Sequence, residues 1–447
     1  MPFIQRYYKW LLAFCCAVFA LQMWLCSGTL APYAATLSNP HLINDQGDYI
    51  SIEGDTNLSE LGCYYIANYD HKHYIANYQL IDRKPKEEWN WAYLLRRPLL
   101  YIVAYPFMKM FGFLGGGFIM AVLINILVLI GFSRWVSQRW GQTAALAGAI
   151  ILCAYPATMY WSGQPYPHIL ITACTLLLTM FLYKVYESDN LKTIALYSLW
   201  AGISFLAYDT YIFFVPAFGL LLLVQKKWKA IPVSMFFLGL PLGLWLWFLS
   251  GKTIPQASGN TDIYGNIITA YLNATGGELW TNLTKLPYLL YRNFSDALYL
   301  YAAILFVVII VLGKATKSLR VDLPFWVIAA GMFFVFAFNN MAPPYEGWQM
   351  RGTWIARIYQ PAIILCLLPL FSVIKNWQEA DKKNLVRGIL IACVVTFGFN
   401  TRINVSPAFS DDSQTYHHYN FYFHAMPETM GENLEKYGRR PLWVCPD

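Results

Sequence analysis

Four carboxylates lie close together in the segment NDQGDYISIEGD, which covers residues 44–55. A carboxylate at a membrane surface can act as a general base when it lies within hydrogen-bond reach of an acceptor hydroxyl. Asp45 and Asp48 rank equally as candidates for this base, Asp55 ranks third and Glu53 ranks below it. A second carboxylate could instead orient the acceptor or bind a metal. The alternative for the whole cluster is a solvated loop with helix-capping acids.

Basic residues form a second set of candidates, in segments that we expect at the same membrane face. The set consists of Arg96, Arg97, Lys285, Arg292, Arg351 and Arg357. Basic residues usually gather on the cytoplasmic side of a membrane protein, so this set needs an explanation. A lipid-linked phosphate or pyrophosphate would provide one, because guanidinium groups bind phosphate oxygens in a bidentate manner. Contact with lipid headgroups or with nearby acids is the alternative.

Histidine and cysteine residues give weaker signals. His71 and His73 form an H-x-H pair in DHKH, but without a second pair they predict a divalent metal site only weakly. Cys63 and Cys445 lie well inside polar segments, where an oxidising compartment would allow them to form a disulfide bond. No Walker loop, GxGxxG, Ser–His–Asp order or HExxH motif stands out, so cytoplasmic nucleotide chemistry is not supported.

Membrane helices must position these residues. The chain is 57% hydrophobic and 13% charged, whereas soluble domains carry about 25% charged residues. Apolar runs of roughly 17–25 residues, the length that crosses a bilayer, recur along the chain and predict an all-α polytopic membrane protein with about eleven transmembrane helices. The expected spans are residues 10–27, 115–133, 143–160, 168–184, 193–208, 211–224, 232–249, 297–313, 324–340, 358–374 and 385–400.

The distribution of Lys and Arg predicts which connections face the cytoplasm. Alternate connections carry cations, such as Arg134 and Arg139 after the second expected span, whereas the opposite connections WSGQPYP and AYDT carry none. We therefore expect a cytoplasmic N-terminus and an exported C-terminus. No clustered basic face of the kind that binds nucleic acid is visible.

This topology divides the chain into a transmembrane domain over residues 1–400 and a small exported tail over 401–447. Two long exported loops are expected inside the domain, at 28–114 and 250–296. The end of the first loop, residues 96–113, is apolar but interrupted by prolines and a lysine. We expect it to form an amphipathic helix in the outer membrane interface.

Several motifs in this arrangement resemble the GT-C glycosyltransferases, which include protein O-mannosyltransferases, lipid A aminoarabinose transferases and bacterial arabinosyltransferases. DQGDY is similar to their acidic element after the first helix, with Asp45 four residues before Tyr49 and Gln46 in place of the common second acid. RPLLY…MFG resembles a second element, and YPATMYWSGQPYPH a proline-containing turn. RIYQP resembles a late helix start, with Ile358 inserted between Arg357 and Tyr359.

The resemblance implies a multi-pass enzyme of the bacterial inner membrane whose active site faces the periplasm. It would transfer a sugar, such as arabinofuranose, from a polyprenyl-phosphate donor to a pilin-like protein or a cell-surface glycan or lipid, with inversion. The roles implied are Asp45, Asp48 or Asp55 as the base, Arg357 with Arg351, Arg97 or Arg96 at the donor phosphate, and Tyr49, Glu53 and Tyr359 in support.

Two other functions remain open at this stage. A secondary transporter or flippase of a lipid-linked sugar usually carries ionisable residues within its spans, and this chain has few. A non-catalytic membrane assembly protein would use its exported loops as a docking surface. Such a protein would tolerate substitutions of Asp45, Asp48 and Arg357 but not of aromatic residues in the loops.

Overall fold

The structure is a computed structural model of the 447-residue chain. It describes residues 2–27, 41–43, 49–51, 65–67, 77–82, 97–162, 166–208, 211, 214–252, 272–294, 297–341 and 359–409. The expected all-α polytopic class is confirmed. Seven of the described helices are long and apolar enough to cross a membrane, and further apolar helices are shorter.

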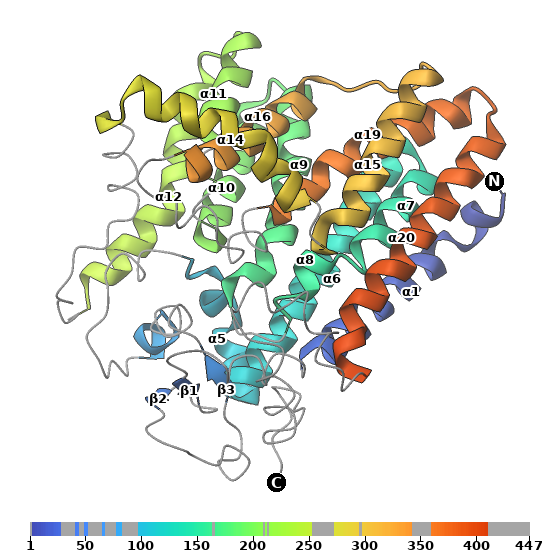
Figure 1. The fold of residues 1–447 in the computed structure, drawn as a ribbon. Helices are drawn as coiled ribbons and strands as arrows, with labels where there is room; N and C mark the ends of the chain where they lie inside the picture. The colour runs from blue at the N-terminus through green and yellow to red at the C-terminus, as the bar shows by residue number, and fades with distance from the viewer. Residues whose placement is uncertain are drawn as a thin grey trace.

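Each of the expected spans coincides with a helix. These helices are α1 (Pro2–Ser27), α6 (Phe113–Trp140), α7 (Gln142–Leu152), α9 (Ile171–Glu187), α10 (Leu191–Ala207), α11 (Phe214–Val224), α12 (Ala230–Ser250), α15 (Ala297–Ala315), α16 (Leu323–Met341), α19 (Ile363–Glu379) and α20 (Lys383–Phe409). Figure 1 shows α1, α7 and α20 at one side of the bundle and α10, α11 and α12 at the other, with α6 and α9 between them.

Shorter elements lie between these helices. They are β1 (His41–Ile43), β2 (Tyr49–Ser51), β3 (Tyr65–Ala67), α5 (Leu99–Phe111), α8 (Pro156–Met159), the 3₁₀ helices η2 (Pro167–Leu170) and η5 (Gln360–Ala362), and α14 (Gly276–Phe294). The strands form one small antiparallel sheet in the order β2-β1-β3, with Tyr49 opposite Ile43. The sequence did not predict this sheet, because three-residue strands are too short to show an alternating pattern.

Helix α5 confirms that a separate helix precedes the second expected span. The chain turns between α5 and α6 at Gly112, whose φ is 75°. One turn later, α6 packs so closely on α5 that a Cβ on Gly116 would collide with the backbone of Phe107 and Met108. The glycines of FLGGGF therefore allow close packing of two helices rather than a flexible connection.

Three connections between helices turn in the same way. Lys226, Lys317 and Asp381 follow α11, α15 and α19 and have left-handed φ angles of 59°, 54° and 51°. In each turn the next N–H donates to the carbonyl five residues earlier, as Lys227 does to Leu222 at 2.9 Å. This is the Schellman pattern, which satisfies the last carbonyls of a helix.

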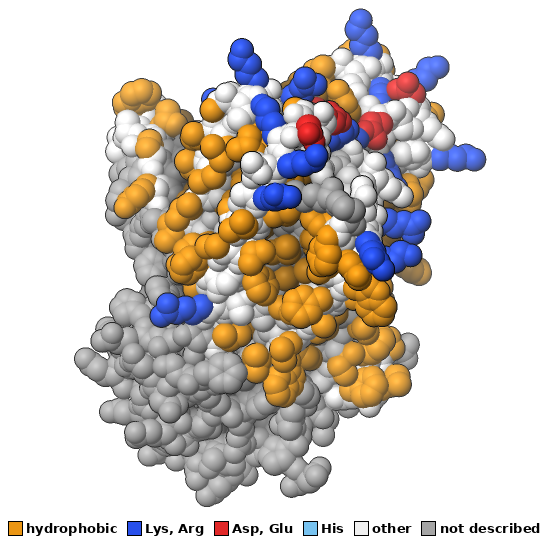
Figure 2. Space-filling model, turned by 90° about the vertical axis from the view of Figure 1, so that its right-hand side faces the viewer, with side chains coloured by type: hydrophobic (Ala, Val, Ile, Leu, Met, Phe, Trp, Pro, Cys, Tyr) orange, Lys and Arg blue, Asp and Glu red, His pale blue; other side chains and the backbone are white. Residues whose placement is uncertain are grey.

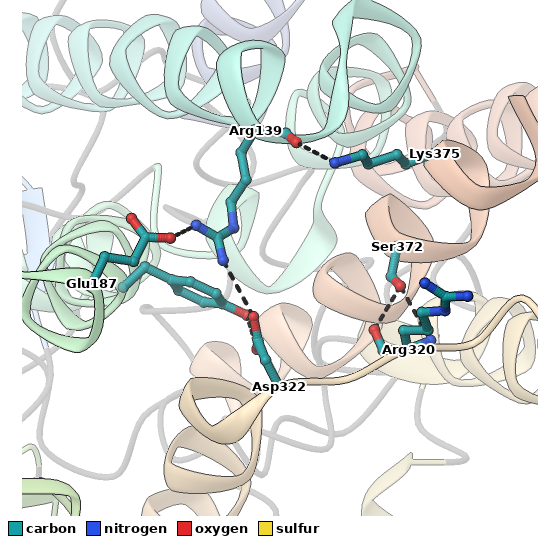
Figure 3. A network of polar contacts seen from close by, with 7 residues as sticks. Arg139, Glu187, Arg320, Asp322, Ser372 and Lys375 are labelled. Atoms are coloured by element: carbon teal, nitrogen blue, oxygen red, sulfur yellow. Dashed lines mark hydrogen bonds and ion pairs between the residues drawn. The ribbon is translucent and has the colours of Figure 1, made fainter. Parts of the chain in front are cut away.

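These turns meet the other cation-bearing connections at one end of the bundle. Figure 2 shows most of the Lys and Arg side chains of the face in view, with the few Asp and Glu, gathered at one end above a broad apolar belt. Figure 3 shows Arg139 at the end of α6 between Glu187 of α9 and Asp322 before α16. Lys375 of α19 donates to the carbonyl of Arg139 at 3.3 Å. The alternate connections that carry cations thus lie together at one end of the bundle. That this end faces the cytoplasm stays a prediction.

Candidate functional site

Arg97 is the one predicted phosphate ligand whose side chain the structure describes; Lys285 and Arg292 belong to the backbone of α14. It lies just before α5 with a left-handed φ of 56°, and its side chain is buried with 4% exposure. Its Nη1 donates to Nε2 of His168 at 2.7 Å. Because a guanidinium is always protonated and can only donate, Nε2 must accept, and the His168 ring is neutral with its proton on Nδ1. The guanidinium also lies 4.9 Å from the ring centre of Tyr208.

Aromatic rings fix His168 in this orientation. Tyr166 and Trp161 stack on its imidazole at ring-centre distances of 4.3 and 4.8 Å, and Tyr208 meets it edge-on at 5.9 Å. These residues come from η2, from the turn after α8 and from the end of α10. The result is a buried cation in an aromatic enclosure, where electrostatic interactions are stronger than in water.

Helix α6 helps to hold η2 in place. Asn125 is buried in α6, and its Nδ2 donates to the carbonyl of Ile169 at 3.2 Å. Carbonyls at the end of a short 3₁₀ helix lack regular partners, so a buried amide donor stabilises this segment. Asn125 therefore supports the backbone that carries His168.

A second polar cluster lies one helical turn from His168. Gln360 is fully buried, and its Nε2 donates to Oγ1 of Thr172 at 2.8 Å and of Thr158 at 3.4 Å. The two hydroxyl oxygens lie 2.5 Å apart, and the hydroxyl of Tyr155 donates to the carbonyl of Gln360 at 3.1 Å. This Gln360 cluster joins α8, α9 and η5.

Asp82 is a buried carboxylate that the sequence analysis did not single out. It lies at the end of a short helix over residues 77–82 and forms an ion pair with Lys109 of α5. The hydroxyl of Tyr105 donates to Oδ1 of Asp82 at 3.2 Å. Hydrogen bonding to Asp82 raises the pKa of Lys109. In the same helix, Leu80 packs with Leu206 and Trp245, so this part of the first long loop is docked on the bundle.

An apolar groove of about 720 Å³ runs between α5, α6, α9, α10 and α12. Leu99, Leu170 and Leu206 are among its lining residues, and each is two residues from Arg97, His168 or Tyr208. The groove continues toward Gly131 and Met180 in the middle of α6 and α9. The lining of the groove therefore includes chain neighbours of all three residues around the buried guanidinium of Arg97.

Tyr359 is the other predicted site residue whose side chain is described. It is buried beside Phe294 and Tyr299, at ring-centre distances of 5.7 and 6.4 Å. The backbone of Tyr49 belongs to β2. The remaining predicted residues lie outside the described residues: Asp45, Asp48, Glu53, Asp55, His71, His73, Arg96, Arg351, Arg357, Cys63 and Cys445. Within the described part of the chain, no group of three or more His, Cys, Asp or Glu residues could hold a metal ion.

Sequence reasoning did not connect His168 with Arg97. The sequence does contain a signal for this contact. His168 begins one expected span, Tyr208 ends the next span, and RPLLY, which starts with Arg97, precedes a third. Helix ends on the same side of a membrane can meet. Their pairing, however, joins residues 71 positions apart, which no local pattern specifies.

The family model of dolichyl-phosphate-mannose-protein mannosyltransferases matches residues 97–249. The match confirms the resemblance to GT-C glycosyltransferases. It covers about a third of the chain, begins at Arg97, and includes His168, Tyr208 and the groove. Residues 97–249, which include several membrane helices, are therefore similar to a glycosyltransferase domain of the GT-C type. No curated protein sequence matches the chain significantly.

Proposed function

We propose that this protein transfers a sugar from a polyprenyl-phosphate donor to an acceptor on the exported side of a bacterial inner membrane. The observation that carries this proposal is the buried Arg97, held by His168 and Tyr208, each two residues along the chain from a residue that lines an apolar groove. A lipid phosphate combines the two properties that this arrangement suits, an anionic head and a long hydrocarbon chain.

The donor would enter from the side of the bundle. Its isoprenoid chain would lie along the groove, whose lining is almost entirely apolar and includes the half-exposed Ile102 and the exposed Leu127 and Leu244. Its phosphate would lie against Arg97, whose guanidinium can bind two phosphate oxygens at once. Arg357, with Arg351 or Arg96, would bind the same phosphate. Low-dielectric surroundings strengthen such a contact and favour the release of an anionic leaving group.

The reaction follows from this placement. The acceptor hydroxyl attacks the anomeric carbon, the new bond from that carbon to the acceptor oxygen forms, and the bond to the phosphate oxygen breaks. Asp45 or Asp48 takes the proton of the hydroxyl, and the lipid phosphate leaves with the bonding electron pair. Attack from the face opposite the phosphate inverts the anomeric centre. General-base assistance is worth about 10²–10⁴-fold, and phosphate stabilisation contributes at least as much.

Two sugars deserve a direct comparison. The description of the matching family names mannose, and the motifs of the chain resemble arabinosyltransferases as well as mannosyltransferases. Purified protein in lipid vesicles would be incubated with radiolabelled polyprenyl-phosphate mannose or polyprenyl-phosphate arabinofuranose and an extract of exported acceptors. We expect label to move from one lipid donor to an acceptor, and no transfer from the corresponding nucleotide sugar.

Two results would contradict this function. Transfer from a nucleotide sugar but not from a lipid donor would exclude the proposed donor class. Movement of the labelled lipid between the two leaflets without transfer would show a flippase, which could use the same groove.

A further inference from the structure

The short helix over residues 77–82, which belongs to the first long loop, is buried in the bundle. Its residues Asn77, Tyr78, Gln79 and Leu80 are each at most 3% exposed. A helix this short contains few internal hydrogen bonds and is not stable alone, so tertiary contacts must hold it. Its position is therefore set by the residues against which it packs.

Two anchors fix the 77–82 helix to α5 and α6. The ring of Tyr78 lies 4.9 Å from the ring of Phe113 in α6 and 6.1 Å from that of Tyr105 in α5. Asp82, whose side chain is 6% exposed, forms an ion pair with Lys109 and accepts from the hydroxyl of Tyr105. Burying a carboxylate costs free energy, which a cation and a hydroxyl offset only when they are well placed. These contacts thus favour one orientation of the helix.

Leu80 connects the same helix to the groove. It belongs to a small hydrophobic cluster, here called the Leu80 cluster, whose buried members are separate from the main core. The other members come from α5, α10 and α12 and are Leu99, Leu206, Trp245, Phe248 and Leu249. All of them except Leu249 line the groove, and Leu80 does not. Leu80 therefore packs on the wall of the groove without lining its interior.

The shape of this wall depends on Leu80. Trp245 stacks on Phe248 at a ring-centre distance of 5.3 Å, and a close-packed neighbour keeps such large side chains in one arrangement. Removal of Leu80 would leave a void beside Leu206 and Trp245, into which these side chains could turn. The groove would then lose its shape on the side formed by α10 and α12.

The groove suits an isoprenoid chain in both length and polarity. Its lining on α6 runs from Met120 to Gly131, a distance of about 16 Å at about 1.5 Å per residue. An extended farnesyl chain has a similar length. Among the described residues that line the groove, the one hydroxyl group belongs to Ser204 and donates to the carbonyl of Trp200 at 2.9 Å. The occupant therefore needs no polar group along its chain.

We propose that Leu80 is a positioning residue of the groove, and that docking of the 77–82 helix and binding of the isoprenoid chain stabilise each other. The helix supports the wall that the chain contacts, and the chain fills the space into which that wall would otherwise relax. Coupling of this kind is reciprocal, so the chain stabilises the docked helix by the same factor by which the helix raises the affinity for the chain. This inference rests on the proposed function, because the occupant is the isoprenoid chain of that donor.

Hydrogen exchange of the purified protein in lipid nanodiscs tests the coupling without any substitution. Farnesol is the probe, because it has an isoprenoid chain and no phosphate. We expect saturating farnesol to slow exchange of the backbone amides of residues 77–82 by about fivefold or more, the usual range for coupling between two sites. The amides around Asp381, at the charged end of the bundle, should exchange at the same rate with and without farnesol. Unchanged exchange in residues 77–82 with farnesol bound would overturn the proposal.

Matched variants separate positioning from a general loss of packing. Leu80→Ala should weaken binding of farnesol and of farnesyl phosphate equally, by about tenfold, and Leu80→Met, which keeps the volume of the side chain, should restore both affinities. Leu370→Ala removes a fully buried leucine of α19 that does not line the groove, and it should leave both affinities unchanged. Calorimetry measures the affinities. Unchanged farnesol binding by Leu80→Ala, or equal weakening by Leu370→Ala, would assign Leu80 a purely structural role. If Leu80→Ala fails to fold, the hydrogen-exchange result decides the question.

A substitution at Gly131 shows whether the probes occupy this groove. Gly131 lines the groove, and a Cβ there would lie in open space, so Gly131→Leu extends into the groove without a clash. We expect it to weaken binding of both probes. Gly388→Leu, at an equally open glycine of α20 that does not line the groove, should weaken neither. Full affinity of Gly131→Leu for farnesol would place the probe elsewhere and overturn the proposal.

Failure of the proposed function gives a different result. If the unmodified protein binds farnesyl phosphate no better than farnesol, recognition of a lipid phosphate by Arg97 is contradicted, whereas the coupling is still measured with farnesol. If farnesol binds and the exchange of residues 77–82 does not change, the coupling is overturned and the donor class is not affected.

Discussion

At the scale of single residues, the pair Arg97 and His168 links the sequence motifs to a chemistry. A neutral imidazole accepts from the guanidinium at 2.7 Å, and the central carbon of the guanidinium lies over the ring of Tyr208, 4.9 Å from its centre. Lysine cannot replace this arrangement, because an ammonium group lacks the planar fork and stacks less well on aromatic rings. The geometry therefore suits an arginine that binds a planar or tetrahedral anion. A positive charge alone would not be sufficient.

Substitution of Arg97 tests that argument. Arg97→Lys should raise the donor KM by about tenfold, and Arg97→Gln should lower the rate of transfer by about 10²–10³-fold, as loss of one electrostatic contact to a leaving group does. Donor saturation curves for sugar transfer measure both effects. Arg134→Gln removes an exposed arginine on α6 and serves as the control. A fully active Arg97→Gln enzyme would remove Arg97 from the site.

The catalytic base is predicted from sequence and is tested by isosteric replacement. Either Asp45→Asn or Asp48→Asn should reduce transfer by about 10²–10⁴-fold while donor binding is retained, because an amide cannot accept the proton of the acceptor. Asp189→Asn, at an exposed carboxylate before α10, is the control. Radiolabel transfer is measured beside farnesyl phosphate binding. Full activity of both variants would refute the assignment of the base to this pair.

At the scale of elements, the contact between α5 and α6 helps to form the groove, and Arg97 lies two residues before α5. The site depends on this contact because Arg97 directly precedes α5 and the groove is lined by both helices. Gly116 permits the close approach, since a side chain there would meet the backbone of α5 rather than a movable side chain. Backbone atoms cannot shift without moving the whole helix.

Gly116→Ala should therefore destabilise the protein by about 1–3 kcal/mol, the usual cost of overpacking, although alanine favours a helix. The neighbouring Gly115→Ala meets only Cβ of Phe111 at 3.9 Å, an ordinary contact, and should be neutral or slightly stabilising. Thermal unfolding of the two variants in the same detergent measures the difference. Equal melting temperatures would show that α5 and α6 pack less closely than described.

At the scale of the whole molecule, the charged connections form one end of the bundle. Arg139 contacts Glu187 and Asp322, its guanidinium lies 4.5 Å from the ring centre of Tyr183, and its carbonyl accepts from Lys375. This network joins helices that are distant in sequence. It shows that cations gathered in these connections also contribute to packing.

Reporter fusions test the orientation that we predict for this end. Fusions after Asp189, Trp228 and Asp381 should all report a cytoplasmic location, and fusions after Gln164 and Asp209 an exported one. A pair of reporters, one active only in the cytoplasm and one only after export, gives opposite signals at each position. The reverse pattern would place the proposed donor site on the cytoplasmic side, where nucleotide sugars are available. A mixture of signals within the first group would contradict the gathering of the charged connections at one end of the bundle.

The helices could be predicted from the sequence because a membrane span is specified by residues that are consecutive in the chain. A span needs a certain length of apolar chain, and its direction follows from the flanking cations. For this reason every expected span coincides with a helix, including the short α7 and α11. The small sheet β2-β1-β3 and helix α14 were not expected, because neither has a long apolar run.

By itself, the sequence determined the membrane-helical class, the alternation of charged connections and the resemblance to GT-C enzymes, which the family model supports over residues 97–249. The tertiary structure decided which of the candidate residues meet. It joined Arg97 to His168 and Tyr208, and Gln360 to Thr158 and Thr172, across separations of 71 to 202 residues. The physical reason is that these contacts depend on close packing of helices against one another, as at Gly116, and close packing is a property of surfaces in three dimensions.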